Sequence, residues 1–226
     1  MHPRRFTSQL TTSRVIFQSV ITATLFAVTS LNGCARLAPG SIQSANERSD
    51  ASPIYLVRGF SDWYSAGIDI LADDLRKHGL PAKVYRDEQW RDLAAALVQN
   101  RSRHSTPPVL VGYSYGADDV ISIAEELGKN HTTVKLLVTI DPVTPDPVPE
   151  NVSSCVNFYQ PNGMWDVFPW LRGIPLEAQS STSTLLQNVN VRDRQDLVEP
   201  NTSHSTIAGN AKIRQAIVDL ILKGTK

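Results

Sequence analysis

A serine between two glycines is the residue of this sequence best placed for nucleophilic chemistry. Residues 112–116 read Gly-Tyr-Ser-Tyr-Gly, which fits the pattern G-x-S-x-G with Ser114 at its centre. An apolar run over residues 108–113 leads into the motif, and a helical pattern over residues 120–127 follows it. A sharp turn between a strand and a helix exposes the serine hydroxyl, and glycines let such a turn close. We therefore expect Ser114 to be a nucleophile, the alternative being a plain glycine-lined turn.

This strand, motif and helix resemble the nucleophile elbow of the α/β-hydrolase superfamily. The resemblance extends over nearly all of residues 53–226 and implies a compact α/β fold, a mostly parallel sheet flanked by helices with a small cap or none. It implies a serine hydrolase of the lipase, esterase or thioesterase kind. In that chemistry Ser114 attacks an ester or thioester carbonyl and water releases the acyl-enzyme, and no cofactor is required.

A serine hydroxyl needs a base within hydrogen-bonding reach, and the sequence has five histidines. His104 and His131 precede predicted strands, which places them at the opposite end of a parallel sheet from Ser114. His78 closes a predicted helix, and His204 alone follows the last predicted strand. In the superfamily the order is serine, acid and then histidine after the final strand, which implies that His204 is the base. The alternative is a histidine in a surface loop.

The acid that would orient this histidine is less sharply defined. Asp141 ends the apolar run over residues 136–140, at the end of a strand where functional groups collect in parallel sheets. It resembles the strand-end Asp-Pro of lipases that carry their acid one strand earlier than most relatives, which implies that it is the catalytic acid. A turn-forming role is the alternative. Three further candidates remain: Asp166, which occupies the commoner superfamily position, Asp193 and Asp196.

Two backbone N–H groups are implied as donors to the developing oxyanion. One belongs to Tyr115, directly after the nucleophile. The other belongs to Phe60, after the first strand of the domain, where Gly59 allows close approach of the backbone. Many relatives have His-Gly at this point and this chain has Arg58-Gly59. Arg58 either ties the loop by an ion pair or meets an anionic group of the substrate.

Short β-branched runs alternate with helical patterns along the rest of the chain. Such alternation favours a parallel sheet with helices on both faces. Residues 141–152 contain four prolines and cannot hold a helix, so that crossover is unusual or the next strand is not parallel. The predicted strands cover residues 54–57, 82–85, 108–113, 134–140, 152–159 and 186–191. The predicted helical patterns run over residues 68–80, 93–98, 120–127 and 213–222.

Aromatic residues gather in the loops expected near the nucleophile. Apolar walls suit an acyl or aryl substrate, although residues 165–171 are equally well explained as a roof over the core. Residues 160–184 are long and lack a clear period, which makes them the best lid candidate. The pocket candidates are Trp63, Tyr64, Trp165, Phe168 and Trp170.

The N-terminus has the pattern of an export signal. A basic start precedes an apolar stretch over residues 15–31 and then small residues, which predicts a signal peptide over residues 1–33. A membrane-spanning helix is the alternative, but the apolar part is short and diluted by hydroxyl side chains. A serine- and proline-containing tether without periodicity follows, so we expect the catalytic domain to occupy residues 53–226.

Residues 31–34 read Leu-Asn-Gly-Cys and resemble the bacterial lipoprotein signal, although Asn32 stands where family members usually have a smaller or hydroxyl residue. The resemblance implies that residues 34–52 are a lipidated N-terminus and tether. Acylated Cys34 would hold the protein on a membrane of the bacterial cell envelope. The alternative is a disulfide between Cys34 and Cys155, but Cys155 lies in an apolar run and is explained more simply as a small buried residue.

Charge and composition limit the possible partners. The chain has 22 basic and 22 acidic residues, so no basic surface is predicted to bind nucleic acid. Metal-ligand spacings and a phosphate-binding glycine loop are not found in the sequence. We expect a small acyl ester or thioester as substrate and a membrane as partner, and the oligomeric state stays open. Two rival functions remain: a non-catalytic envelope lipoprotein that binds a ligand on the same fold, and an acyltransferase in which an alcohol replaces water.

Overall fold

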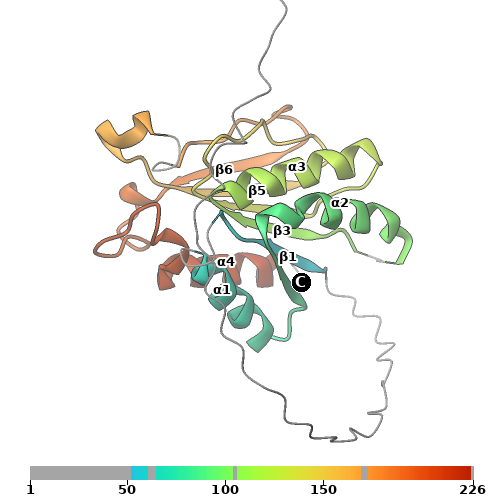
Figure 1. Cartoon of the computed structure of the whole chain (residues 1–226), viewed down its shortest axis with the longest axis horizontal. Coiled ribbons are helices and arrows are strands. Elements are labelled where there is room, and N and C mark those ends of the chain that lie inside the picture. The colour runs from blue at the N-terminus through green and yellow to red at the C-terminus, as the bar shows by residue number, and fades with distance from the viewer. Residues whose placement is uncertain (1–51, 61–64, 104–105, 169–172, 225–226) are drawn as a thin grey trace, which may run out of the picture. The chain divides into compact units, whose positions relative to one another are not determined.

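The computed structural model describes residues 52–60, 65–103, 106–168 and 173–224 (Figure 1). Predictions about residues 1–51, including the signal peptide, Cys34 and most of the tether, lie outside these residues. So do the positions of Trp63, Tyr64 and Trp170 and the side chains of Trp165 and Asp166. Within the described ranges, none of the helices is long and apolar enough to cross a membrane.

Six parallel strands form one sheet in the described part of the chain, in the order β2-β1-β3-β4-β5-β6. The α/β class predicted from the sequence is therefore confirmed. Val134 was predicted to lie within the fourth strand, but it forms only an isolated bridge with Val152 ahead of that strand. The strands are β1 (Ile54–Val57), β2 (Ala82–Tyr85), β3 (Val109–Tyr113), β4 (Leu136–Ile140), β5 (Ser154–Tyr159) and β6 (Leu185–Asn190).

Helices cover both faces of the sheet, α1 and α4 on one face and α2 and α3 on the other (Figure 1). Leu80 extends the apolar spacing of the first helical pattern but lies beyond α1, because Gly79 at φ 76° follows the helix end. The long helices are α1 (Ala66–Lys77), α2 (Trp90–Gln99), α3 (Tyr115–Lys129) and α4 (Ala211–Gly224). The short 3-10 helices are η1 (Asp87–Gln89), η2 (Arg101–Arg103), η3 (Gly163–Val167), η5 (Val191–Asp193) and η6 (Ile207–Gly209).

The two faces of the sheet carry separate apolar clusters. Successive side chains of a strand point to opposite faces, so Val138 of β4 packs under α1 and α4 while Leu137 packs under α2 and α3. Cys155 of β5 is a free cysteine fully buried in the second cluster, as its apolar surroundings in the sequence predicted. Burial raises the pKa of its thiol to about 12, so it is an inert core residue.

The proline-rich crossover from β4 to β5 has no helix, and yet β5 pairs with β4 in parallel. Side-chain hydrogen bonds in both directions between the crossover and α3 hold it in place instead. The carboxylate of Asp118 in α3 accepts the N–H groups of Val143 at 3.0 Å and Thr144 at 2.9 Å. Asn151 donates its side-chain N–H to the carbonyl oxygen of Ala124 at 2.9 Å. The prolines therefore exclude a crossover helix without preventing parallel pairing.

A row of polar side chains on β4, β5 and β6 binds the connection from β5 to β6. Thr139 donates its hydroxyl to Asn157 at 2.9 Å, and Asn157 donates to Asn188 at 2.9 Å. Asn157 also donates to the carbonyl oxygen of Ile174, and Asn188 accepts the N–H of Leu176 at 2.8 Å. This row fastens residues 174–176 to the face of the sheet where a helix would otherwise lie.

The strand order reverses between β1 and β3, which determines where a site can form. The chain leaves β1 outward to β2 and then returns to the other side of β1 as β3. In open parallel sheets the crevice beyond the carboxyl ends of such strands is the usual ligand site. Gly59, just after β1, and Ser114, just after β3, both lie at this crevice.

Gly67 provides a test of how closely α1 approaches the loop before α4. A Cβ at this position would overlap the backbone of Ala208 and lie 2.6 Å from the backbone nitrogen of Gly209. We expect Gly67→Ala to lower the free energy of unfolding by about 1–3 kcal/mol, because the closely packed backbone must shift. Urea denaturation measures the change.

The matched control is Gly209→Ala, because a Cβ there would find no atom within 4 Å. Its effect should stay within about 0.5 kcal/mol. Equal stability of the two variants would contradict the close contact between α1 and η6.

Candidate active site

Ser114 lies in a strained turn between β3 and α3. Its φ is 55° and its ψ is −125°, a conformation that is costly for a residue with a Cβ. A Cβ on Gly112 would overlap the carbonyl oxygen of Gly116, and a Cβ on Gly116 would overlap the backbone carbonyl of Arg58. The Ser114 N–H donates to the carbonyl oxygen of Ile140 at 2.9 Å. The two glycines and the hydrogen bond to β4 therefore allow this turn to persist.

The hydroxyl of Ser114 meets His204, and His204 meets Asp141. The Ser114 Oγ to His204 Nε2 distance is 2.9 Å, and the His204 Nδ1 to Asp141 Oδ2 distance is also 2.9 Å. These contacts fit the neutral imidazole with its proton on Nδ1, which donates to the carboxylate and leaves Nε2 to accept the serine proton. Ser114 is 7% exposed, His204 8% and Asp141 0%, so the relay is largely shielded from water.

His204 is held in place by Tyr113 of β3, the residue that precedes Ser114. The hydroxyl of Tyr113, the last residue of β3, donates to the carbonyl oxygen of His204 at 2.6 Å. The two rings also lie beside each other, with centroids 5.8 Å apart. Within the loop, Thr206 accepts the N–H of Ser203 at 2.9 Å and donates to the carbonyl oxygen of Asn201 at 2.8 Å. The histidine therefore sits on a loop that is stiffened internally and anchored to β3.

Asp141 follows β4 at a φ of 52°, and its N–H donates to the carbonyl oxygen of Phe158 in β5 at 2.8 Å. Its Oδ1 accepts the backbone N–H of Gln160 at 2.7 Å. Burial raises the pKa of the Asp141 carboxyl, while the hydrogen bonds from His204 and Gln160 oppose that rise. A Cβ on Gly173 would overlap Oδ1, so the backbone there packs directly against the carboxylate.

The other acidic candidates from the sequence have different surroundings. Asp193 accepts a hydrogen bond from Asn190 at 2.8 Å, and Asp196 forms an ion pair with Arg194 at 2.6 Å. The side chain of Asp166 lies outside the described part of the structure. Among the acids whose side chains are described, Asp141 is the one hydrogen-bonded to His204.

The loop after β1 packs against Ser114. A Cβ on Gly59 would lie 3.0 Å from the Cβ of Ser114, a tight contact that a larger residue would relieve only by shifting the backbone. Ser65, the fully buried residue before α1, donates its hydroxyl to the carbonyl oxygen of Gly59 at 3.3 Å. Arg58 pairs with Asp69 of α1 at 2.6 Å, which is the ion-pair role considered for it from the sequence. Both contacts fasten the loop to α1.

Phe60 and Tyr115, the two residues expected to donate to an oxyanion, follow Gly59 and Ser114 directly. Their rings contact each other edge to face, with centroids 6.4 Å apart. The Phe60 side chain is 82% exposed and that of Tyr115 is 37% exposed. Ser114 is therefore flanked by an exposed aromatic pair.

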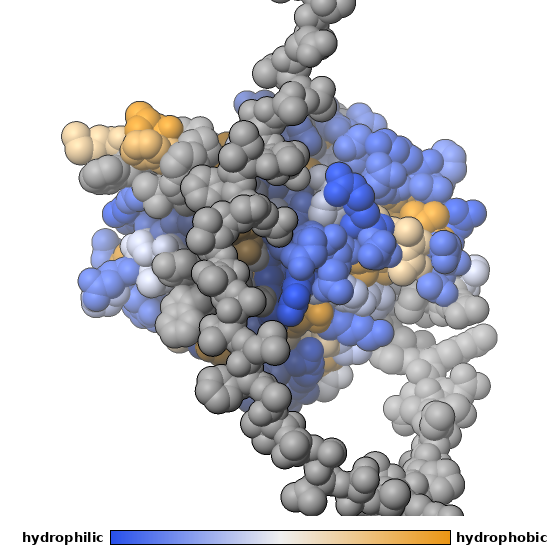
Figure 2. Space-filling view, in the orientation of Figure 1, coloured by the Kyte–Doolittle hydropathy of each residue, from blue (hydrophilic) through white to orange (hydrophobic). Residues whose placement is uncertain are grey.

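Further apolar surface lies over η3, where Met164, Val167 and Phe168 are exposed. Figure 2 shows hydrophobic surface at the upper left, where Figure 1 places η3. Phe168 is thus the one pocket candidate from the sequence whose side chain the structure describes, and it belongs to this exposed surface. Hydrophobic patches of this kind mark contact sites for apolar ligands or partners.

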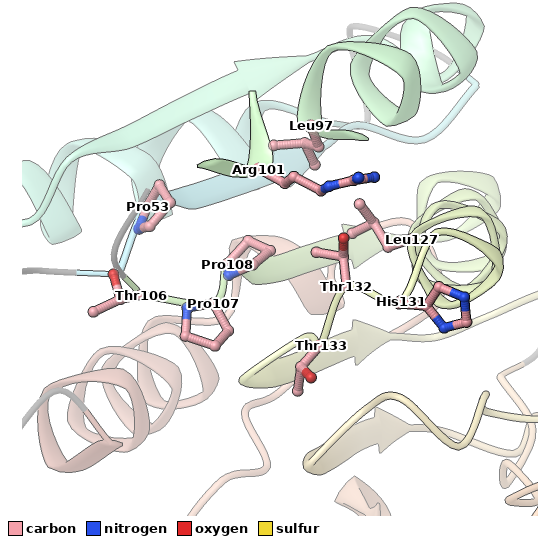
Figure 3. A pocket seen from close by; sticks show the side chains of 10 residues that line it. All are labelled: Pro53, Leu97, Arg101, Thr106, Pro107, Pro108, Leu127, His131, Thr132 and Thr133. Carbon is pink, nitrogen blue, oxygen red and sulfur yellow. The ribbon is translucent and has the colours of Figure 1, made fainter. Parts of the chain in front are cut away.

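Two cavities differ in their relation to these residues. One of about 370 Å³ lies between the first turns of α1 and the loop that carries His204, and Thr202 and Ser205 are among its lining residues. The other, of about 280 Å³, lies at the opposite edge of the sheet, beside the residues that precede β1, β3 and β4 (Figure 3). Pro53, Pro108 and Thr133 line it, far from the carboxyl ends of the strands, so it is not part of the candidate site.

Sequence reasoning missed three contributors to the site. Gln160 holds Asp141 through its backbone N–H, and Tyr113 holds the histidine loop through its hydroxyl. Asp118 in α3 is the third contributor, because its carboxylate accepts the N–H groups of two residues in the turn that starts at Asp141. Burial raises the pKa of Asp118 to about 6, against the effect of the N–H groups that it accepts. For Tyr113 alone the sequence offered a signal: it ends an apolar strand, and a buried tyrosine hydroxyl needs a hydrogen-bond partner.

Comparison with known proteins adds little at the level of sequence. No family model and no curated protein matches the chain. Among solved structures, the chain is similar to a protein described as a hydrolase of the alpha/beta superfamily from Xanthomonas campestris. The two are 17% identical over 76% of this chain and 99% of the other, with a TM-score of 0.41.

Two further structures are similar in the same degree. A cutinase-like protein from Cryptococcus is 14% identical over 78% of this chain and 97% of its own, with a TM-score of 0.45. The thioesterase domain that cyclises the lipopeptide antibiotic surfactin is 10% identical over 79% and 94%, with a TM-score of 0.46. All three scores lie below 0.5.

If Asp141 orients His204, Asp141→Asn will preserve the fold and reduce turnover of a short-chain aryl ester by about 10³- to 10⁴-fold. An amide favours the wrong imidazole tautomer and cannot stabilise the imidazolium. On a Ser114→Ala background the same change should add little, because members of one catalytic unit are not additive. Initial rates measure the effect, with circular dichroism to show that each variant is folded.

Asp166→Asn is the matched control and should cost less than about tenfold. If Asp166→Asn nearly abolishes turnover and Asp141→Asn stays active, Asp141 is not the acid that orients His204.

Proposed function

We propose that this protein is a serine hydrolase that cleaves carboxylic ester or thioester bonds through an acyl-enzyme. The observation that carries the proposal is the continuous relay from Ser114 through His204 to Asp141, with both contacts at 2.9 Å. A buried relay of hydroxyl, imidazole and carboxylate is the arrangement that raises the nucleophilicity of serine. The strained φ of Ser114 supports the same conclusion, because such strain persists mainly at functional sites.

The chemistry follows from the contacts. His204 Nε2 takes the hydroxyl proton of Ser114 as Oγ attacks the carbonyl carbon, and Asp141 stabilises the imidazolium that results. The backbone N–H groups of Tyr115 and Phe60 donate to the oxyanion of the tetrahedral intermediate. His204 then returns the proton to the leaving alcohol or thiol, and the acyl group remains on Ser114. Water, activated by His204 in the same way, releases the acid and restores the hydroxyl.

The surroundings of Ser114 favour a substrate with an apolar group. Phe60 and Tyr115, which directly follow Gly59 and Ser114, present exposed rings that contact each other. An acyl or aryl group that covers such rings removes apolar area from water, which stabilises the complex. We infer an ester or thioester with a hydrocarbon acyl chain rather than a highly charged substrate.

We also infer that the domain acts at the bacterial cell envelope. This proposal is supported by the sequence of residues 1–34, where a basic start, an apolar stretch and Leu-Asn-Gly-Cys resemble a lipoprotein signal. An acylated Cys34 would keep the enzyme on a membrane while residues 34–52 serve as a tether.

The direct test is reaction of the purified domain, beginning at residue 53, with a fluorophosphonate probe. We expect one adduct per molecule at Ser114, located by intact mass and peptide mapping, because His204 activates that hydroxyl. Ser114→Ala should abolish labelling, and Ser122→Ala, which alters a serine of α3 outside the relay, should leave it unchanged. A folded domain that forms no adduct would instead favour the non-catalytic binding protein.

A second test concerns the apolar substrate. We expect Phe60→Ala to lower kcat/KM for a p-nitrophenyl octanoate by about 5- to 10-fold, and for the acetate by less than about twofold, because only the longer chain reaches the exposed ring. Tyr115→Phe keeps a ring at the neighbouring position and serves as the control, with little change for either ester. Equal losses for both esters would mean that the Phe60 ring does not contact the acyl chain.

A further inference from the structure

Gln160 connects three parts of the candidate site that are far apart in the sequence. It follows β5 directly and is 2% exposed. Its backbone N–H donates to Asp141 Oδ1 at 2.7 Å, and its side-chain Nε2 donates to the carbonyl oxygen of Thr202 at 3.0 Å. Its own carbonyl oxygen accepts the N–H of Gly173 at 3.2 Å. One residue therefore touches the acid, the histidine loop and the returning β5–β6 connection.

The contact with Thr202 bears on the distance between acid and base. Thr202 stands two residues before His204 on the same loop, whereas Asp141 stands at the end of β4. The backbone of Gln160 is bonded to one of these groups and its amide to the other. Gln160 thus spans the gap between the acid and the histidine loop, beside the His204 Nδ1 to Asp141 Oδ2 contact of 2.9 Å.

The two oxygens of Asp141 are divided between these partners. Oδ2 accepts from His204, and Oδ1 accepts from the N–H of Gln160 while the backbone of Gly173 packs against it. With both oxygens engaged, the carboxylate cannot rotate away from the imidazole without breaking the bond to Gln160. A charged hydrogen bond of this kind is stronger than a neutral one, which makes that rotation costly.

We propose that Gln160 is a positioning residue of the hydrolase, and that its side-chain amide holds the histidine loop in register with Asp141. This inference rests on the proposed function. Gln160 does not touch the reacting atoms; it acts through Thr202 and Asp141. Second-layer contacts of this type determine how well a catalytic group stays in its productive geometry, and small displacements there cost large factors in rate.

The main variant is Gln160→Met, which keeps the backbone N–H and a similar side-chain volume but removes the donor to Thr202. We expect kcat for p-nitrophenyl acetate to fall by about tenfold or more, with KM changed by less than about twofold, because substrate contacts are intact while His204 is less well held. Rates are expressed per reactive site, counted by fluorophosphonate titration. A purely structural role would reduce the number of reactive sites and leave kcat per site unchanged.

Gln160→Glu provides a second readout and protects the test against poor folding of the first variant. Its carboxylate would face the carbonyl oxygen of Thr202 and add negative charge near Asp141 and His204, with Arg192 the nearby cation acting on Asp141. We expect the acidic limb of the kcat/KM profile to move to higher pH by about half a unit or more, since negative charge favours protonated His204. An unmoved limb together with a wild-type kcat would overturn the proposal.

Gln187→Met is the matched control, because Gln187 is an exposed glutamine of β6 away from these contacts. It should behave as the wild type in kcat, in KM and in the pH profile. If the wild type itself is neither labelled nor active, the proposed function has failed. If the wild type is active and Gln160→Met has the same kcat per site, only the role of Gln160 is overturned.

Discussion

The site depends on how closely the first turn of α3 packs against the ends of β1 and β3. That approach is possible because Gly112 and Gly116 present no side chain where the backbone of one element meets the other. The resulting turn places Ser114 at a positive φ, and the hydrogen bond from Ser114 to Ile140 of β4 helps to hold it there. Larger residues at these glycines would separate helix and strand, and Ser114 would lose its position although none of the side chains of the relay had been changed.

The same parallel sheet brings the remaining groups of the candidate site to Ser114. The carboxyl ends of parallel strands lie at the same side of the sheet. The loop after β1, Ser114 after β3 and Asp141 after β4 are therefore brought together by the strand order alone. Beyond β4, polar side chains replace the crossover helices. Asp118 fixes the turn that starts at Asp141, and the row from Thr139 to Asn188 fixes the return of the β5–β6 connection. These polar contacts hold the surroundings of Asp141 in place in a region where prolines prevent helix formation.

Much of this arrangement could be predicted from local patterns. The glycines around Ser114, the apolar strand before it and the helix after it are neighbours in sequence, and each pattern acts over a few residues. The six strands were predicted near their observed positions for the same reason. The errors lie at element ends: strand pairing decides that Val134 is outside β4, and Gly79 at positive φ decides that Leu80 is outside helix α1. Parallel pairing of β5 could not be predicted, because the prolines before it were also compatible with a strand that is not parallel to β4.

The sequence alone determined the nucleophile motif, the alternation of strands and helices and the order of serine, acid and histidine. Only the tertiary structure decided which described carboxylate meets His204 and which residues hold the pair. The reason is distance along the chain: Ser114 and His204 are 90 positions apart, and Asp141 and His204 are 63 apart. Contacts of that kind leave no local periodicity or spacing behind. Gln160 illustrates the point, because an ordinary glutamine after a strand becomes a link between acid and base only once β5 and the histidine loop lie side by side.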